Sequence, residues 1–284
     1  MTDARPTLYL SRLLPDPVMA LVRERFQLVQ DPLDALPVPS ALREGLCQAD
    51  AAIVTLGDHI DAETIHAATR LKILANYAVG YNNIDLAATH VRGLIVTNTP
   101  DVLTDATADL TWALLLATAR RVVEGDALVR SGRWTGWSPT QLLGAEVSGK
   151  TLGIIGMGRI GQAVAHRAVG FRMPVRYHTS QPMATSSLPR EWEHRSLHDI
   201  LGEADVVTVH VPLTPATHHL IGARELTWMR PTSFFINTAR GPIVDERALL
   251  DALKTGIIAG AGLDVYEQEP AIHSELAQLK QVVL

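Results

Sequence analysis

Short apolar runs alternate along the chain with stretches whose apolar residues recur at helical spacing. In the first part the runs lie at 7–11, 51–55, 71–76 and 94–98, with helical patterns at 15–26 and 61–70. A second series has runs at 151–156, 174–178, 205–212, 233–239, 257–265 and 282–284. Unalternated apolar strands separated by helices are typical of parallel sheets covered on both faces. The pattern therefore predicts an α/β protein with two sheets.

The boundary between the two series predicts two domains. Residues 104–132 are apolar at helical spacing over an unusual length, and we expect one long interdomain helix there. We assign 1–99 to one domain and 100–284 to the other. A doubly wound dinucleotide-binding domain has six strands, so the run at 282–284 is expected to be the sixth. We expect this run to be cut short, with a return of the chain to the first domain missing.

Composition and charge favour small-molecule chemistry. Of the 284 residues 47% are hydrophobic and 19% charged, as in globular proteins. A net charge of −5 gives no reason to expect a nucleic-acid partner. No apolar run suggests a membrane span and the N-terminus lacks a signal-peptide core. The single cysteine, Cys47, fits a reducing compartment, so a cytoplasmic location is expected.

A glycine motif opens the second series of strands. Gly156, Gly158 and Gly161 have G-x-G-x-x-G spacing directly after a predicted strand and at the start of a predicted helix. In this context the first glycine permits a tight turn, the second lets the backbone approach a pyrophosphate, and the third lets helix and strand pack closely. The motif predicts a Rossmann-type dinucleotide site.

A second motif, at 144–151, has the spelling of a phosphate-binding P-loop but the wrong context. A working P-loop follows a strand and leads into a helix. Here Gly144, Gly149, Lys150 and Thr151 follow a loop and lead into a strand. We therefore do not expect a triphosphatase.

The segment after the glycine motif favours NADP(H) over NAD(H), although NAD(H) remains possible. An NAD site usually has an acidic residue about 20 positions beyond the glycines, to bind the ribose 2′-hydroxyl. Residues 162–190 contain no acidic residue but several arginines, and the second strand ends in His178, Thr179 and Ser180. An imidazole and hydroxyls can donate to a 2′-phosphate, which a carboxylate would repel.

Several segments together resemble the D-isomer-specific 2-hydroxyacid dehydrogenases, and within them the glyoxylate/hydroxypyruvate reductases. They are NYAVGYNNID (76–85), NTPDVLTDATADLTWALLLATARR (98–121), WTGWSPTQLLGAEVSGKTLGIIGMGRIG (134–161), HVPLTPATHHLIG (210–222), INTARGPIVDERAL (236–249) and GLDVYEQEP (262–270). The resemblance implies a flavodoxin-like substrate domain, a Rossmann-type cofactor domain, reduction of a small 2-keto acid, and a homodimer.

Reduction of a 2-keto acid needs a cation for the carboxylate, a hydride donor and a proton donor. Arg240 follows a predicted strand at the carboxyl edge of the sheet, where such folds bind ligands, and its planar fork suits a carboxylate. The resemblance implies that Arg240 is catalytic and substrate-binding, that the amides of Val79 and Gly80 hold the substrate carboxylate, and that Glu269 orients a catalytic histidine and raises its pKa.

Further cofactor contacts are implied by the resemblance alone. The amides of Arg159 and Ile160 should reach the pyrophosphate, and Asp264 the nicotinamide carboxamide. The remaining expected contacts are Val211, Pro212 and Thr217 on the adenosine side and Thr107, Thr238 and Ala239 on the nicotinamide side.

The family's catalytic histidine is expected a few residues beyond Leu284. His194 and His198 have helical spacing that could ligate a metal, but no third ligand accompanies them, and no metal is expected. Two alternatives stay open: another family member, such as a phosphoglycerate dehydrogenase, and a non-catalytic protein that senses the cofactor on the same fold. The Tyr-Ala-Val-Gly form of the 77–80 loop favours the reductase.

Overall fold

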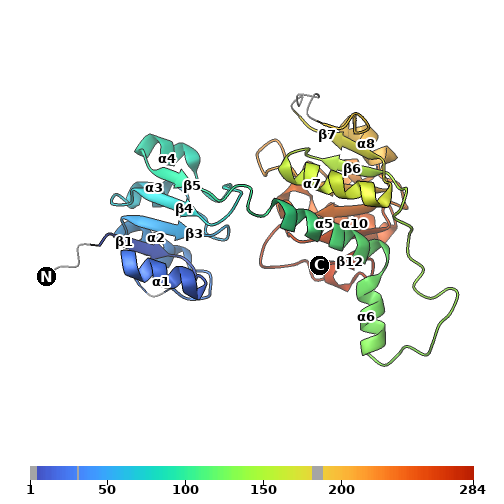
Figure 1. Cartoon of the computed structure of the whole chain (residues 1–284), viewed down its shortest axis with the longest axis horizontal. Coiled ribbons are helices and arrows are strands. Elements are labelled where there is room, and N and C mark those ends of the chain that lie inside the picture. Colours follow the sequence, from blue (N-terminus) through green and yellow to red (C-terminus); the bar gives the residue numbers. More distant parts are fainter. Residues whose placement is uncertain (1–4, 31, 181–187) are drawn as a thin grey trace. The chain divides into compact units, whose positions relative to one another are not determined.

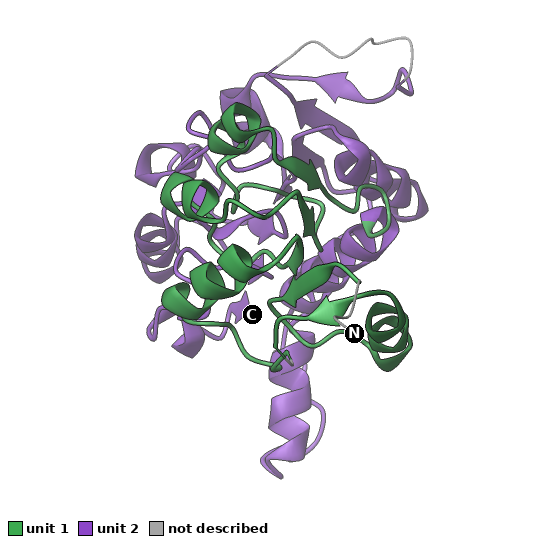
Figure 2. Cartoon of the chain, turned by 90° about the vertical axis from the view of Figure 1, so that its left-hand side faces the viewer, with its two compact units in different colours: residues 1–103 green, residues 104–284 purple. Residues whose placement is uncertain are grey.

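The computed structural model describes residues 5–30, 32–180 and 188–284. The chain forms two compact units, Met1–Leu103 and Thr104–Leu284 (Figure 2). This division lies four residues beyond the predicted boundary at 99.

Unit 1 contains a parallel sheet with the strand order β2-β1-β3-β4-β5, five strands within the described residues. This order is the flavodoxin-like one, as the resemblance implied. The strands are β1 (Thr7–Leu10), β2 (Gln27–Leu28), β3 (Ala51–Val54), β4 (Ile73–Asn76) and β5 (Ile95–Thr97); the helices are α1 (Asp16–Arg25), α2 (Pro39–Gln48), α3 (Ala62–Ala67) and α4 (Leu86–Arg92).

Alternation along β1 explains how helices cover both faces of this sheet. Leu8 and Leu10 pack with Met19 and Val22 of α1, whereas Tyr9 points to the other face and packs with residues of α2, α3 and α4. Loops follow the strands at the carboxyl edge, among them the loop after β4 that carries Val79 and Gly80.

Unit 2 contains a parallel sheet of seven described strands in the order β12-β11-β10-β9-β6-β7-β8. The chain winds from β6 first to one side and then, from β9, to the other, which is the doubly wound arrangement. The strands are β6 (Leu152–Ile155), β7 (Val175–His178), β8 (Glu193–His194), β9 (Val206–Val209), β10 (Phe234–Asn237), β11 (Gly260–Leu263) and β12 (Val282–Val283). The fold class predicted from the sequence is confirmed.

The count of strands in this sheet corrects one expectation. β8, a two-residue polar strand, pairs with β7 through Tyr177 and His194, and no hydrophobic pattern marked it. With β8 included, the strand at 282–283 is the seventh of the sheet and not the sixth. It pairs with β11 at Ala261 and Gly262.

Helices cover both faces of the second sheet (Figure 1). α5 and α7 pack on one face around Ile154 and Ile236, and α8, α9 and α10 pack on the other around Val207 and Phe235. These helices are α5 (Thr104–Ala119), α7 (Arg159–Ala168), α8 (Leu197–Glu203), α9 (Ala223–Leu226) and α10 (Glu246–Thr255); short 3₁₀ helices lie at Val169–Phe171, Gly241–Ile243 and Leu276–Gln278.

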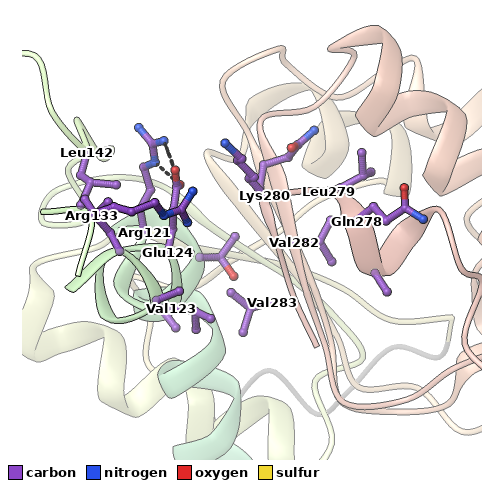
Figure 3. A pocket seen from close by; sticks show the side chains of 16 residues that line it. Arg121, Val123, Glu124, Arg133, Leu142, Gln278, Leu279, Lys280, Val282 and Val283 are labelled. Atoms are coloured by element: carbon purple, nitrogen blue, oxygen red, sulfur yellow. Dashed lines mark hydrogen bonds and ion pairs between the residues drawn. The ribbon is translucent and has the colours of Figure 1, made fainter. Parts of the chain in front are cut away.

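The predicted long helix is two helices, α5 and α6 (Val122–Arg130). Arg121 takes a left-handed backbone conformation, with φ of 54°, and this ends α5. The Arg121 guanidinium holds Glu124 by two hydrogen bonds of 2.9 Å beside a cavity of about 400 Å³ (Figure 3). The apolar periodicity of the sequence continues through this break, so the pattern could not show where α5 ends.

Candidate active site

The glycine motif forms the turn between β6 and α7. Gly156 has φ of 100°, and a Cβ there would lie 2.6 Å from the backbone of His210. A Cβ on Gly161 would lie 2.1 Å from the carbonyl oxygen of Gly156. Only glycine therefore permits this turn and this contact between helix and strand.

Gly158 differs from the other two glycines because open space surrounds it. It is the N-cap of α7, and a Cβ on it would meet no atom within 4 Å. The first amides of a helix lack partners within the helix and face any anion at its N-terminus. The turn and the amides of Arg159 and Ile160 therefore fit a pyrophosphate.

The other predicted cofactor residues follow neighbouring strands at the same edge of the sheet. His178 ends β7, Val211 follows β9, and Asp264 follows β11. The Thr217 hydroxyl donates to the Pro212 carbonyl at 2.6 Å and so closes the loop after β9. The strand order places β6 between β7 and β9, which is where the winding reverses and such folds bind dinucleotides.

Thr111, for which the sequence predicted no role, links two predicted cofactor residues, Thr107 and Thr238. The hydroxyl groups of Thr111 and Thr238 lie 2.9 Å apart, and Thr111 also donates to the Thr107 carbonyl at 2.8 Å. Thr111 is fully buried. It therefore holds the turn after β10 against α5, on the side assigned to the nicotinamide.

Arg240 lies in a turn that Asn237 fixes. The Asn237 Nδ2 donates to the Arg240 carbonyl at 3.0 Å, and its Oδ1 accepts from the Ala239 amide at 3.0 Å. The Arg240 side chain turns back and donates to the Ala239 carbonyl at 2.6 Å. Burial lowers the pKa of Arg240, although the charge of Glu269 opposes this shift. An arginine stays protonated in any such environment, so the site holds a partly desolvated cation.

The loop after β11 carries two carboxylates, Asp264 and Glu269, and the charge of Glu269 acts on this cation. Desolvation, and then the charge of Glu269, raise the pKa of Asp264. The Glu269 Oε1 accepts from the Tyr266 amide at 3.0 Å. A Cβ on Gly241 would lie 1.8 Å from the Tyr266 carbonyl oxygen, so this loop packs directly against the residue after Arg240. The predicted pair Arg240 and Glu269 therefore belongs to one electrostatic cluster.

A model of the D-isomer specific 2-hydroxyacid dehydrogenase NAD-binding domain matches residues 112–284. The chain is 48% identical to a glyoxylate reductase of Thermococcus gammatolerans over 286 residues, which cover 99% of this chain and 85% of the relative. The chain belongs to the D-isomer specific 2-hydroxyacid dehydrogenases.

Two solved structures are similar to this chain in fold and sequence. The TT0316 protein of Thermus thermophilus is 46% identical, with a TM-score of 0.89 over 98% of this chain and 88% of that one. An NADPH-dependent glyoxylate/hydroxypyruvate reductase of Sinorhizobium meliloti, solved with NADP and malonate, is 33% identical, with a TM-score of 0.88 over 99% of this chain and 86% of the other.

The arginines near the glycine motif are used differently from what the sequence suggested. Arg167 donates to Asp109 at 2.8 Å and to Asp105 at 3.1 Å, both on α5. Arg176 forms ion pairs with Glu203 and Glu193. Their charges are therefore largely compensated. At the end of β7, His178 Nδ1 lies 3.2 Å from the Arg195 carbonyl.

A histidine not assigned a role from sequence lies behind the glycine turn of this dehydrogenase. The His210 amide donates to the Ile155 carbonyl at 2.7 Å, and its Nε2 lies 2.9 Å from the Thr208 hydroxyl. Burial lowers the pKa of His210 to about 3, so the ring is neutral at physiological pH. Its ring is a hydrogen-bond partner of Thr208 beside the glycine turn.

His194 and His198, which have metal-ligand spacing, lie in different surroundings. His194 is in edge contact with Tyr177, and His198 with Trp228. No cluster of three metal-ligating side chains occurs in the described part of the chain. Likewise, no helix within 5–30, 32–180 or 188–284 is long and apolar enough to cross a bilayer.

Proposed function

We propose that this dehydrogenase reduces glyoxylate or hydroxypyruvate to the corresponding 2-hydroxy acid, with NADPH as the preferred hydride donor. Relatives named glyoxylate reductase, 44–48% identical over almost the whole chain, support glyoxylate as the substrate. The bound cofactor supplies the hydride. The observation that carries the proposal is Arg240, a partly buried cation at the carboxyl end of β10 on which the charge of Glu269 acts.

Arg240 has two functions in this proposal. Its guanidinium binds the substrate carboxylate and stabilises the charge that develops on the ketone oxygen as hydride arrives. The proton donor is the catalytic histidine that the family resemblance implies. Glu269 orients this histidine and keeps it protonated near neutrality, because a carboxylate next to an imidazole favours the imidazolium. The amides of Val79 and Gly80 in unit 1 are the second group suited to a carboxylate.

Steady-state oxidation of NADPH by the full-length protein tests this function. Glyoxylate or hydroxypyruvate should be reduced with a higher kcat/KM than 3-phosphohydroxypyruvate, the substrate of the phosphoglycerate alternative. Arg240→Gln should lower kcat/KM for glyoxylate about 1,000-fold, as expected for loss of a charged transition-state contact. A protein that binds NADPH tightly but reduces none of the three acids would instead support the cofactor-sensing alternative.

The preference for NADPH rests on the end of β7. His178, Thr179 and Ser180 offer hydrogen-bond donors and no carboxylate at the position that normally recognises the ribose. The solved relative from Sinorhizobium meliloti is described as NADPH-dependent.

A cytoplasmic location of the protein fits its single cysteine, and the location of a tagged protein in cells would test it.

The homodimer is proposed from α6 and the segment that follows it. No residue of α6 is buried, and Figure 1 shows this helix extending away from the sheet of unit 2. Large apolar side chains are exposed along it and beyond: Val122 (55%), Val123 (52%), Val129 (57%), Trp134 (51%), Trp137 (82%) and Leu143 (66%). We take these exposed apolar side chains as parts of a protein interface.

A second copy of the chain is the proposed occupant, because the family resemblance implies a homodimer. Val123→Asp combined with Trp137→Ser should convert the dimer into a monomer in analytical ultracentrifugation. Arg133→Ser in the same region should leave the dimer intact. A wild-type protein that sediments as a monomer would contradict the proposal.

A further inference from the structure

The backbone of the loop after β4 is held in one orientation by the segment after β5. β4 and β5 are parallel neighbours, so both segments leave the sheet at the same edge. The Thr99 amide donates to the Ala78 carbonyl at 2.9 Å. The Asn98 Nδ2 donates to the Val79 carbonyl at 2.8 Å. Two successive carbonyls of the loop therefore face the same segment, 98–99.

The direction of these carbonyls fixes the direction of two N–H groups. A trans peptide is planar and its N–H points opposite to its C=O. The Ala78 carbonyl and the Val79 N–H belong to one peptide group. The Val79 carbonyl and the Gly80 N–H belong to the next. Both N–H groups must therefore point away from segment 98–99. In the part of the chain that the structure describes, neither of them donates to another residue.

The far end of the loop is fixed as firmly by buried amides. The Asn76 Nδ2 donates to the Gly80 carbonyl at 2.8 Å. Asn83 donates to the carbonyls of Thr55 and Asp58 at 3.0 and 3.1 Å. Asn76 and Asn83 are 1% and 5% exposed and lie within hydrogen-bond distance of each other. The end of the loop is thus anchored independently of Asn98, whereas the orientation of the 79–80 peptide depends on the hydrogen bond from Asn98.

We infer that Asn98 is a positioning residue for the substrate: it orients the 79–80 peptide so that the N–H groups of Val79 and Gly80 face a carboxylate together. This inference rests on the proposed function and adds the residue that decides how unit 1 recognises the acid group. Successive N–H groups that face one way form a concave site for an anion. Without the Asn98 donor, the 79–80 peptide can rotate and one of the two N–H groups is lost to the anion.

The test is Asn98→Ala in the full-length protein, with Thr89→Ala as the matched control. Thr89 is buried in unit 1 and its hydroxyl donates to the Leu86 carbonyl at 2.9 Å, away from the loop. Because a carboxylate contact holds ground state and transition state alike, its loss raises KM and leaves kcat nearly unchanged. We expect the KM for glyoxylate to rise about tenfold with Asn98→Ala, with kcat changed by less than about twofold.

A direct binding measurement separates this inference from the reaction itself. Oxalate, titrated calorimetrically into the protein saturated with NADP⁺, should bind about tenfold more weakly to Asn98→Ala and normally to Thr89→Ala, while the Kd for NADPH stays as in the wild type. If the wild type reduces glyoxylate and Asn98→Ala has an unchanged KM and oxalate affinity, the inference is wrong and the proposed function stands. A wild type that reduces no 2-keto acid would refute the proposed function instead.

Discussion

The side-chain amide of Asn237 spans the turn that presents Arg240, donating to the Arg240 carbonyl and accepting from the Ala239 amide, each at 3.0 Å. Asn237 is 1% exposed, so both contacts are shielded from water. One buried residue therefore fixes the backbone of the cation on which the proposed chemistry depends.

Asn237→Ala should lower both stability and activity. Two backbone groups lose their partners, which should reduce the free energy of unfolding by about 2 kcal/mol. The Arg240 turn is then free to change conformation, so kcat/KM for glyoxylate should fall about tenfold or more at a temperature where the variant is folded. Urea unfolding and steady-state kinetics measure the two effects.

Ser233→Ala supplies the control for this prediction. Ser233 is also fully buried, just before β10, and donates to the Ala204 carbonyl at 3.0 Å, at the opposite end of the strand. It should lose stability but keep the wild-type kcat/KM. Equal losses of activity in the two variants would show that Asn237 acts only through stability.

Gly158→Ala and Gly161→Ala should separate cofactor binding from folding. The added methyl group at position 158 meets open space, and its φ of −74° suits alanine, so the apoprotein should keep its Tm. The same methyl group should hold a pyrophosphate away from the turn and weaken NADPH binding about tenfold or more. At position 161 the methyl group would lie 2.1 Å from the Gly156 carbonyl, so the apoprotein itself should be destabilised.

Thermal unfolding without ligand and fluorescence titration with NADPH distinguish the two variants. A large loss of Tm in Gly158→Ala, or an unchanged NADPH affinity, would show that the turn does not serve the phosphates as proposed.

His178→Asp should shift the cofactor preference toward NADH. A carboxylate at the end of β7 repels a 2′-phosphate and accepts a hydrogen bond from a 2′-hydroxyl. The ratio of kcat/KM with NADPH to that with NADH should fall about 100-fold. In the control His178→Asn, asparagine has nearly the same shape as aspartate but no charge, so this variant should change the ratio much less. If Asp and Asn give the same ratio, discrimination at this position is not electrostatic.

The sequence could predict the elements whose residues carry a strong local pattern. Apolar runs located the central strands, and strand, glycine spacing and helix together predicted the turn at 156–161. The break at Arg121 was hidden because the apolar period runs through it, and β8 was hidden because a two-residue polar strand has no period.

Contacts between elements distant in the sequence were also beyond prediction. Thr111 contacts Thr238, 127 positions away, and Asn98 donates to the Val79 carbonyl, 19 positions away. Such partners become visible only when the strands are placed side by side. The compensation of Arg167 by Asp105 and Asp109 is a similar case, since 62 and 58 positions, respectively, separate the partners.

His210 should make the stability of the apoprotein depend on pH. Its pKa is about 3 in the folded protein and near 6.5 in an unfolded chain, so the unfolded state binds the proton first as the pH falls. The folded state therefore keeps its full stability above pH about 6.5 and loses it progressively between about 6.5 and 3. At pH 5 the loss due to this group is at most about 2 kcal/mol, from the 1.36 kcal/mol that each pH unit represents.

Urea unfolding of the wild type and of His210→Asn at pH 7 and pH 5 measures this contribution. Asparagine can still bind the Thr208 hydroxyl but does not titrate, so the free energy of unfolding of the variant should be less sensitive to acid. At pH 7 the variant should be less stable than the wild type, because it lacks the imidazole ring. The difference between the two proteins should shrink by about 1–2 kcal/mol on going from pH 7 to pH 5. If both proteins lose the same free energy over this range, His210 takes up no proton on unfolding, and its ring is already charged or solvated behind the glycine turn.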